Sequence, residues 1–262
     1  MEKKLKREFL VKPSESNANR ELPLTLLAAQ LIDIATDHAN ELGIGFIKLE
    51  PKGLGWVLSR MSIEMSRWPK TGESYFISTW VENWNGHFSQ RCFSVEDASG
   101  KLIGYARTVW VIIDLVSHES VGTAGLTLPD GFVTGEGCPI DKFYRHRSFN
   151  PDSVVDYKFK YTDLDFYRHV NTVRYISLLL NQFTLEEFDT HLLSRFDIAF
   201  HHEAKYGDTV QIKSIEEPTE TPFLLRSSNL AASKARTFEL SVGSLPILKA
   251  NITITPLLDS AL

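Results

Sequence analysis

The sequence predicts an α+β fold made of two similar halves, each with one long helix wrapped by an antiparallel β-sheet. Two observations support this prediction. The order of a helix followed by several strands occurs twice along the 262 residues. In addition, SRMSIEMSRWPKTGES (59–74) aligns without gaps with SRFDIAFHHEAKYGDT (194–209), at a constant offset of 135 residues. We therefore expect a duplication rather than two unrelated domains.

The first half, residues 1–118, begins with an amphipathic helix. Apolar residues recur at helical spacing between Pro23, which suits the first turn, and Gly43, which suits the C-terminal cap. Segments rich in β-branched and aromatic residues follow, with turn signals at 85–86 and 99–100. The expected strands are 54–67, 75–84, 88–97 and 102–116.

Residues 119–153 contain many glycines and prolines and show no sustained periodicity, which predicts a connector. The second half, residues 154–262, repeats the order of the first. A short strand at 154–161 precedes a helix expected over 170–183, where apolar residues keep helical spacing. The strands expected after it are 193–202, 208–216, 222–229, 235–243 and 247–255.

The composition bounds the class of protein. A net charge of −5 argues against a general nucleic-acid binder, which needs clustered positive charge. Two cysteines are too few for a disulfide framework, and no apolar run approaches the roughly 20 residues of a membrane span. We expect a cytoplasmic protein. The sequence leaves the oligomeric state open, with a homodimer as one option.

A helix with one apolar face must bury that face, and a strongly twisted antiparallel sheet offers a concave apolar surface that can cover it. This arrangement, made twice in one chain, is a tandem double hotdog.

Four segments carry a resemblance to one family. LGWVLSRMSIEMSRWPKTGE, FISTWVENWNGHFSQRCFSVEDASGKLIGYARTVWVIID, DLDFYRHVNTVRYI and FHHEAKYGD occur here in the order found in acyl-ACP thioesterases, which release fatty acids from acyl carrier protein. The resemblance implies a double hotdog in which the second half is catalytic; we expect the first half to bind the acyl chain. It also implies hydrolysis of the thioester without cofactor or metal, and an acidic carrier protein as partner.

The resemblance also implies the site residues. The family pattern Asp-x-Asn-x-His, followed by Val-Asn at a helix start, matches Asp165, His169 and Asn171, with Tyr167 in place of the family's asparagine. The family's acidic residue matches Glu203. The cysteine next to it in the family is alanine in this chain. Asp165, His169 and Glu203 are therefore expected to be catalytic, with Tyr167 and Asn171 as supporting residues.

The chemistry of thioester hydrolysis selects the same residues. The reaction needs an activated water and stabilisation of charge on the carbonyl oxygen. Asp165 and Glu203 supply carboxylates that orient and deprotonate water, His169 belongs to the polar network around it, and N–H groups at the helix start are expected to act as donors. Asp163 is interpreted as a structural residue, because aspartates before a helix are commonly caps.

Comparison of the halves favours a single site. The repeat position of Glu203 is Trp68, and the first half's helix entry, SESNANRELPLT, has no Asp-x-x-x-His arrangement. An alternative is a metal site formed by His201 or His202 with Glu203, although adjacent residues on a strand point to opposite faces. Two other functions stay open: a hotdog acyl-CoA thioesterase, and a non-catalytic acyl-binding protein, which the tyrosine in the asparagine position favours.

Two further features bear on substrate binding. All five tryptophans lie in the first half and either line an acyl tunnel or fill a sheet core; they are residues 56, 68, 80, 84 and 110. Two basic clusters are candidates for docking an acidic carrier protein. They are Lys3, Lys4, Lys6 and Arg7 at the start, and Arg145, His146 and Arg147 in the connector.

Overall fold

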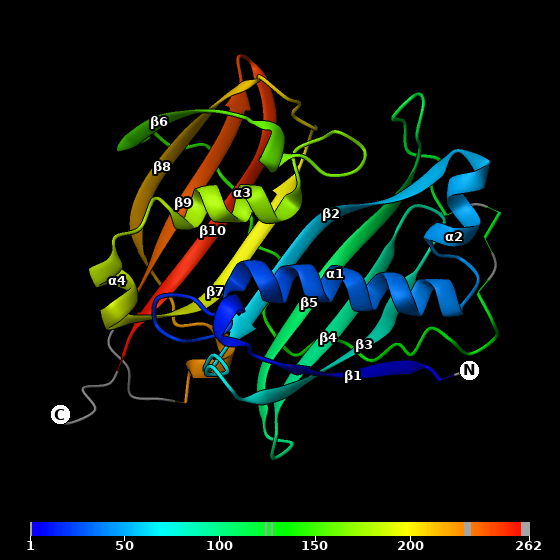
Figure 1. Cartoon of the computed structure of the whole chain (residues 1–262), viewed down its shortest axis with the longest axis horizontal. Coiled ribbons are helices and arrows are strands. Elements are labelled where there is room, and N and C mark those ends of the chain that lie inside the picture. Colours follow the sequence, from blue (N-terminus) through cyan, green and yellow to red (C-terminus); the bar gives the residue numbers. More distant parts are fainter. Residues whose placement is uncertain (1, 124, 127, 228–231, 258–262) are drawn as a thin grey trace. The chain divides into compact units, whose positions relative to one another are not determined.

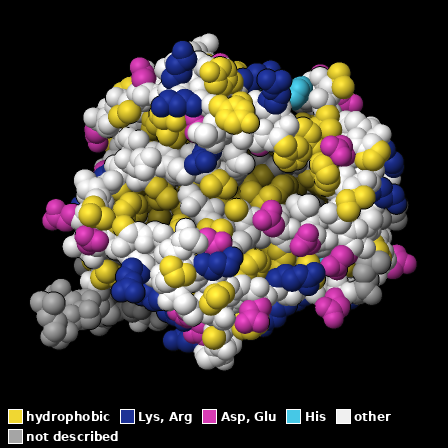
Figure 2. All heavy atoms as spheres, in the orientation of Figure 1, with side chains coloured by type: hydrophobic (Ala, Val, Ile, Leu, Met, Phe, Trp, Pro, Cys, Tyr) yellow, Lys and Arg dark blue, Asp and Glu magenta, His cyan; other side chains and the backbone are white. Residues whose placement is uncertain are grey.

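The computed structural model describes residues 2–123, 125, 126, 128–227 and 232–257. The chain divides into two compact units. The first contains Met1–Ile63 and Trp68–Ile140, and the second contains Glu64–Arg67 and Asp141–Leu262. None of the helices in the described part of the chain is both long and apolar enough to cross a membrane. On the face shown in Figure 2, Lys and Arg side chains are scattered among Asp and Glu.

The first unit contains the predicted helix and meander. Its long helix is α1 (Leu24–Glu41), and its short helices are η1 (Pro13–Glu15), α2 (Phe46–Leu49) and η2 (Glu50–Lys52). Its strands are β1 (Lys4–Leu10), β2 (Leu54–Met65), β3 (Ser74–Trp84), β4 (Ser89–Asp97) and β5 (Leu102–Asp114). The strands lie in the order β1-β3-β4-β5-β2, and α1 crosses one face of them (Figure 1).

Helix α1 follows from its sequence. Its buried face repeats every three to four residues, which places one apolar stripe against the sheet. The helix starts after Pro23. It ends in a Schellman motif, in which Gly43 has φ +69°, its N–H donates to Asn40 O at 2.9 Å, and Ile44 N–H donates to Ala39 O at 3.0 Å. Both predicted ends of this helix are confirmed.

The second unit repeats the order with shorter helices. Its helices are η3 (Tyr161–Asp163), α3 (Thr172–Leu180), α4 (Leu185–Thr190) and η4 (Phe223–Leu225). Its strands are β6 (Ser153–Lys158), β7 (His191–Phe200), β8 (Thr209–Thr219), β9 (Ser233–Val242) and β10 (Leu245–Pro256), in the order β7-β10-β9-β8-β6. Helix α3 covers this sheet (Figure 1), and the Tyr175 ring on it lies 6.1 Å from that of Phe200.

Several predicted boundaries are wrong. The helix expected over 170–183 is shorter, because α3 runs from Thr172 to Leu180. A separate helix that was not predicted, α4, starts after Thr184, which forms a capping box with Glu187. The strand expected at 222–229 is instead the single turn η4 over Phe223–Leu225, and residues 228 and 229 lie outside the described part. Strand β1 was not predicted at all.

The duplication is visible in the structure as matched local geometry. Residues 65, 70 and 72 correspond to 200, 205 and 207 at an offset of 135. Strands β2 and β7 end at the first pair, and the last pair are glycines with φ +85° and +86°. Before the helices, residues 13, 15 and 24 correspond to 161, 163 and 172, an offset of 148, so η1 and α1 align with η3 and α3.

The tryptophans of the first unit contribute to its core. Trp56 and Trp84 pack edge to face at 5.8 Å, against a cluster formed by Ala39, Leu42, Ile44, Val81 and Phe132. Trp80 is buried, and its indole N–H donates to Glu136 O at 2.8 Å. A core role therefore accounts for these three, while the acyl tunnel stays a prediction.

Candidate functional site

The segment between η3 and α3 is a tight turn that Asp165 organises. Asp165 Oδ1 accepts hydrogen bonds from the N–H groups of Tyr167, at 2.9 Å, and His169, at 3.1 Å. The backbone closes the turn, since Asp165 N–H donates to His169 O at 2.8 Å and Arg168 N–H to Asp165 O at 3.0 Å. No described residue donates a hydrogen bond to Oδ2 of Asp165. Oδ1 therefore shapes the turn, and Oδ2 can accept a hydrogen bond or a proton from a bound molecule.

Asp163 and Asn171 fix the turn to its neighbours. The buried Asp163 carboxylate accepts from Lys160 N–H at 2.7 Å and from the Tyr157 hydroxyl at 3.0 Å, which agrees with the structural interpretation of this residue. Asn171 is the N-cap of α3, and its Oδ1 accepts from Val173 N–H at 2.8 Å.

Three of the donors expected at the helix start are already engaged within the fold. Val170 N–H donates to Ala204 O at 2.9 Å, and Asn171 N–H donates to Asp163 O at 2.9 Å. The Val173 N–H is bonded to the cap. The prediction that these N–H groups stabilise a substrate oxygen is therefore wrong for all three, because the turn itself consumes them.

His169 and Glu203 meet across two loops. His169 Nε2 lies 3.3 Å from Glu203 Oε2, with side-chain exposures of 16% and 37%. A backbone bridge between His169 and Lys205 holds the two loops together. The structure thus brings together the two residues that the sequence separates by 34 positions.

A cleft of about 780 Å³ opens beside this pair. Its walls include Asp165, Tyr167 and His169, whereas Glu203 reaches it only through His169. The hydroxyl oxygen of Tyr167 is buried, and its ring packs at 4.2 Å on that of Phe166. The remaining lining residues are Tyr161, Thr162, Leu164, Arg168, Lys205 and Tyr206.

Tyr175 on α3 lies behind the site. It is 3% exposed, and its ring packs edge to face on that of Phe159 at 5.6 Å. Burial raises the pKa of Tyr175 well above its usual range, and the backbone N–H of Ala204 opposes this shift while Glu203 and Asp165 add to it. The phenol therefore stays protonated at neutral pH. Sequence periodicity placed Tyr175 only on a helix and gave no signal for its proximity to the carboxylates.

The histidines next to Glu203 do not follow the strand pattern assumed for them. The strand expected at 193–202 ends at Phe200, so residues 201–204 form a loop and strand alternation does not apply to them. The N–H groups of both His201 and His202 donate to Ile247 O. The His202 ring lies 2.7 Å from Pro246 O through Nδ1, which directs that nitrogen to the backbone.

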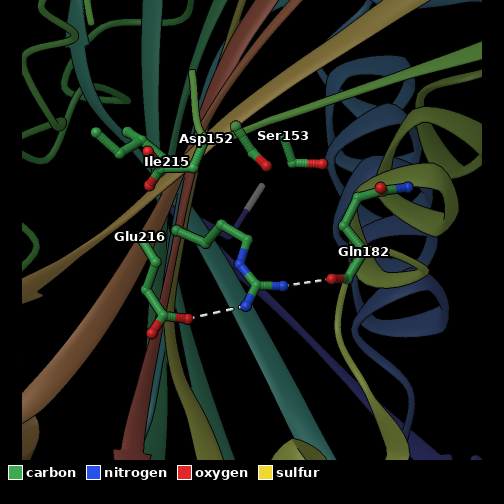
Figure 3. A pocket seen from close by; sticks show the side chains of 7 residues that line it. Asp152, Ser153, Gln182, Ile215 and Glu216 are labelled. Carbon is green, nitrogen blue, oxygen red and sulfur yellow. Dashed lines mark hydrogen bonds and ion pairs between the residues drawn. The ribbon is translucent and has the colours of Figure 1, made fainter. Parts of the chain in front are cut away.

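A second cavity, of about 260 Å³, shares no lining residue with this cleft (Figure 3). Arg236 is one of its lining residues. Its guanidinium donates to Glu216 and Glu187, at 2.8 Å each, and to the carbonyl of Gln182. Because these groups already neutralise and orient the cation, we assign the cavity no role in catalysis.

The same turn occurs in the first unit with different side chains. Asn17 Oδ1 accepts from Glu21 N–H at 2.9 Å, and Asn17 N–H donates to Glu21 O at 2.9 Å. Asn17 and Glu21 correspond to Asp165 and His169 at the offset of 148. The turn is therefore a feature of the fold that appears twice, which sequence comparison missed because the residue types differ. The titratable set with His169 and Glu203 appears only in the second unit, since Trp68 replaces Glu203.

Two family models cover most of the chain. The acyl-ACP thioesterase N-terminal domain matches residues 2–121, and the acyl-ACP thioesterase C-terminal domain matches residues 147–238. Among curated relatives, an oleoyl-acyl carrier protein thioesterase of Arabidopsis thaliana, number 2, is 25% identical over 250 residues, which is 88% of this chain and 68% of that protein. The chain spans 62% of a second such protein from the same plant.

Solved structures share the fold. An acyl-ACP thioesterase from Bacteroides thetaiotaomicron is 30% identical with a TM-score of 0.80, covering 96% of this chain and 98% of that one. The 12:0-ACP thioesterase from Umbellularia californica, at 17% identity, has a TM-score of 0.79 over 97% of this chain and 95% of its own, which supports the fold alone. The fold is the double hotdog, and the chain belongs to the acyl-ACP thioesterase family.

Proposed function

We propose that this protein hydrolyses fatty acyl thioesters of acyl carrier protein, releasing a fatty acid and the carrier thiol. The observation that carries the proposal is the convergence of Asp165 and His169 on one cleft, with Glu203 against His169 at 3.3 Å, in a chain of this family. A reducing compartment such as the cytoplasm belongs to the proposal and fits the two cysteines, which are free thiols.

The geometry suggests a role in thioester hydrolysis for each of Asp165, His169 and Glu203. Asp165 lines the cleft, and two N–H groups hold its Oδ1, so this carboxylate is fixed in orientation and can take a proton from water. His169 lines the cleft, and the Glu203 carboxylate, 3.3 Å from its Nε2, orients the ring. His169 can then donate a proton to the departing sulfur. Water adds to the thioester carbon, the carbon–sulfur bond breaks, and thiol and acid are released.

Tyr167 is proposed to supply the donor that the family's asparagine would supply. Tyr167 lines the cleft with its hydroxyl oxygen buried, so its side chain would have to turn toward the substrate. Its phenol O–H could then donate a hydrogen bond to a carbonyl oxygen as an amide N–H does. This role would replace that of the N–H groups of Val170, Asn171 and Val173, which are used within the fold. With this role Tyr167 is compatible with catalysis, and the experiment below tests the enzyme against the non-catalytic alternative.

The experiment that tests the function compares carriers. Purified protein is incubated with one fatty acyl group attached either to acyl carrier protein or to coenzyme A, across chain lengths, and thiol release is recorded. We expect release from the acyl carrier protein substrate, with the higher kcat/KM. Faster hydrolysis of the coenzyme A thioester would favour the acyl-CoA thioesterase instead. No thiol release from either carrier at any chain length would favour a non-catalytic acyl-binding protein.

A further inference from the structure

The duplicated turn provides an internal comparison for the surface around the cleft. The two turns share their backbone, including a residue in the left-handed region, Arg20 at φ +60° and Arg168 at φ +68°. They also share the hydrogen bonds of Asn17 and Asp165. Side chains that differ between the two turns are therefore not required by the backbone geometry of the turn.

Aromatic residues are the first difference. Tyr161, Phe166 and Tyr206 surround the site in the second unit and are 82%, 73% and 67% exposed. The corresponding residues of the first unit, by the two offsets, are Pro13, Ala18 and Thr71. Exposed clusters of aromatic rings gain little from folding and are typical of surfaces that bind a partner.

Unpaired cations are the second difference. In the first unit Lys70 Nζ forms an ion pair with Glu21 at 2.6 Å. The corresponding residues of the second unit are Lys205 and His169, and His169 pairs with Glu203 instead. Among the described residues, neither Arg168 nor Lys205 has a carboxylate within ion-pair distance of its side chain, and both line the cleft. Two exposed cations thus stand at the mouth of the site.

The basic clusters predicted from sequence are less suited to docking an acidic carrier than the surface around the cleft. In the N-terminal cluster, Lys4 pairs with Glu136 at 2.7 Å, Lys6 pairs with Glu96 at 2.7 Å and Arg7 pairs with Glu41 at 3.1 Å, so its charge is largely neutralised. In the connector cluster, Arg145 and Arg147 are exposed, but neither lines the cleft. The cations beside the cleft are better placed to meet a substrate's carrier.

We propose that the aromatic rim, defined as Tyr161, Phe166, Arg168, Lys205 and Tyr206, is the docking surface for an acidic carrier protein that delivers the acyl thioester into the cleft. The proposal deepens the proposed function and rests on it. The rings supply apolar contact area, and the two cations complement the negative surface of the carrier. The matched turn of the first unit lacks these features. The proposal therefore places one such docking surface on each chain.

The test compares two substrates that share an acyl chain, one carried by acyl carrier protein and one by the small thiol N-acetylcysteamine. We expect Lys205→Glu to lower the ratio of kcat/KM for the carrier substrate to that for the small substrate at least about tenfold, with most of the change in KM. Phe166→Ala should lower the same ratio. Lys101→Glu is the control, because Lys101 is exposed and lies in the turn between β4 and β5 of the first unit, and it should keep the wild-type ratio.

Binding of fluorescently labelled holo carrier protein, measured by anisotropy at low and high salt, tests the docking surface separately from the proposed hydrolysis. If neither substrate is hydrolysed but Lys205→Glu still weakens carrier binding about tenfold, the proposed function fails and the docking surface stands. Wild-type ratios and wild-type binding for both rim variants would overturn the docking surface. An equal loss of kcat/KM with acyl-coenzyme A would also overturn it, because that would indicate recognition of the phosphate-bearing arm. A dimer in sedimentation that Phe166→Ala dissociates would overturn it too.

Discussion

Asp165 serves two purposes through its two oxygens. Oδ1 is engaged by two backbone N–H groups and sets the shape of the turn, whereas Oδ2 accepts no hydrogen bond from the described residues and is proposed to take the proton from water. The first unit shows that the structural task alone needs only an amide, because Asn17 makes the corresponding hydrogen bond to Glu21. The negative charge of Asp165 is therefore the property that the second unit adds. This distinction allows charge and structure to be separated by mutation.

Tyr167 gives the first prediction. Tyr167→Phe removes the hydroxyl and keeps the ring that packs on Phe166, so we expect kcat for the carrier thioester to fall about 100-fold or more, as for loss of one donor to a developing oxyanion. Tyr167→Asn restores an amide donor and should recover much of the loss. Steady-state thiol release measures both variants. Wild-type kcat in Tyr167→Phe would remove the hydroxyl from the mechanism.

His38 gives a prediction of pH dependence for the first unit. The residue is buried on α1, where Nδ1 accepts from Arg91 at 2.9 Å and Nε2 donates to Glu2 O at 3.3 Å. Burial, and then the charge of Arg91, lower the pKa of His38 to about 4. The unfolded state therefore binds a proton first as pH falls, and stability is lost between about pH 6.5 and pH 4.

The magnitude of this effect is on the order of 2–3 kcal/mol. Urea unfolding at pH 7.5 and pH 4.5 measures the loss, with His38→Gln as the control that keeps an acceptor and a donor but does not titrate. The difference between the two pH values should be smaller in His38→Gln by this amount. An identical pH dependence in the two proteins would contradict the assignment.

At the scale of elements, the regular strands and α1 were predictable because their patterns are strong. The missed strand β1 has the sequence KLKREFL, in which Leu5 alone is buried, so an edge strand rich in charge hides its alternation. The opposite error occurred at Phe223–Leu225, where a short apolar run after Pro222 forms a turn rather than a strand. Both errors come from segments whose conformation is set by neighbours.

The site was predictable in its residues but not in its hydrogen bonds. The resemblance selected Asp165, His169 and Glu203 from spacing, and the structure places His169 against Glu203 and Asp165 in the same cleft. The engagement of the helix-start N–H groups was hidden, since it depends on carbonyls of Ala204 and Asp163. Such contacts depend on the tertiary fold and leave no local signal.

Asn171 gives a prediction at this scale. Its Oδ1 caps α3 through Val173 N–H at 2.8 Å, so Asn171→Ala should lower the free energy of unfolding by about 0.5–2 kcal/mol. Asn171→Ser retains a capping oxygen and should lose only a small part of this. Chemical denaturation of the three proteins provides the comparison. Equal stability of the alanine and wild-type proteins would show that the cap is not needed.

At the scale of the whole molecule, the second unit is held to its connector by a buried ionic cluster. Arg195 Nε donates to Asp197 at 2.6 Å, its Nη1 contacts the fully buried Glu64, and its Nη2 donates to Lys142 O at 2.9 Å. Asp197 also accepts from Tyr144 N–H at 3.2 Å. Burial raises the pKa of Glu64, and Arg195 opposes that shift. The cluster therefore joins strand β7, which carries Arg195 and Asp197, to the connector at Lys142 and Tyr144.

Removing this cation should be costly. Arg195→Met leaves two buried carboxylates without their partner, and we expect the unit to lose about 3–5 kcal/mol. Arg60→Met is the matched control, because Arg60 occupies the repeat position and is exposed, so its effect should stay within about 0.5 kcal/mol. Urea unfolding compares both. Equal changes in the free energy of unfolding for the two substitutions would show that the buried ionic cluster does not contribute to stability.

The account as a whole depends on the charge of one carboxylate in the second unit. Asp165→Asn preserves the turn, as Asn17 does in the first unit, so the variant should fold with wild-type stability. We expect its rate of thiol release from acyl carrier protein to fall at least about 100-fold, as should that of Glu203→Gln, while Asn17→Asp keeps the wild-type rate. Single-turnover thiol release from these variants is the most direct measurement. Undiminished rates in both Asp165→Asn and Glu203→Gln would contradict the site.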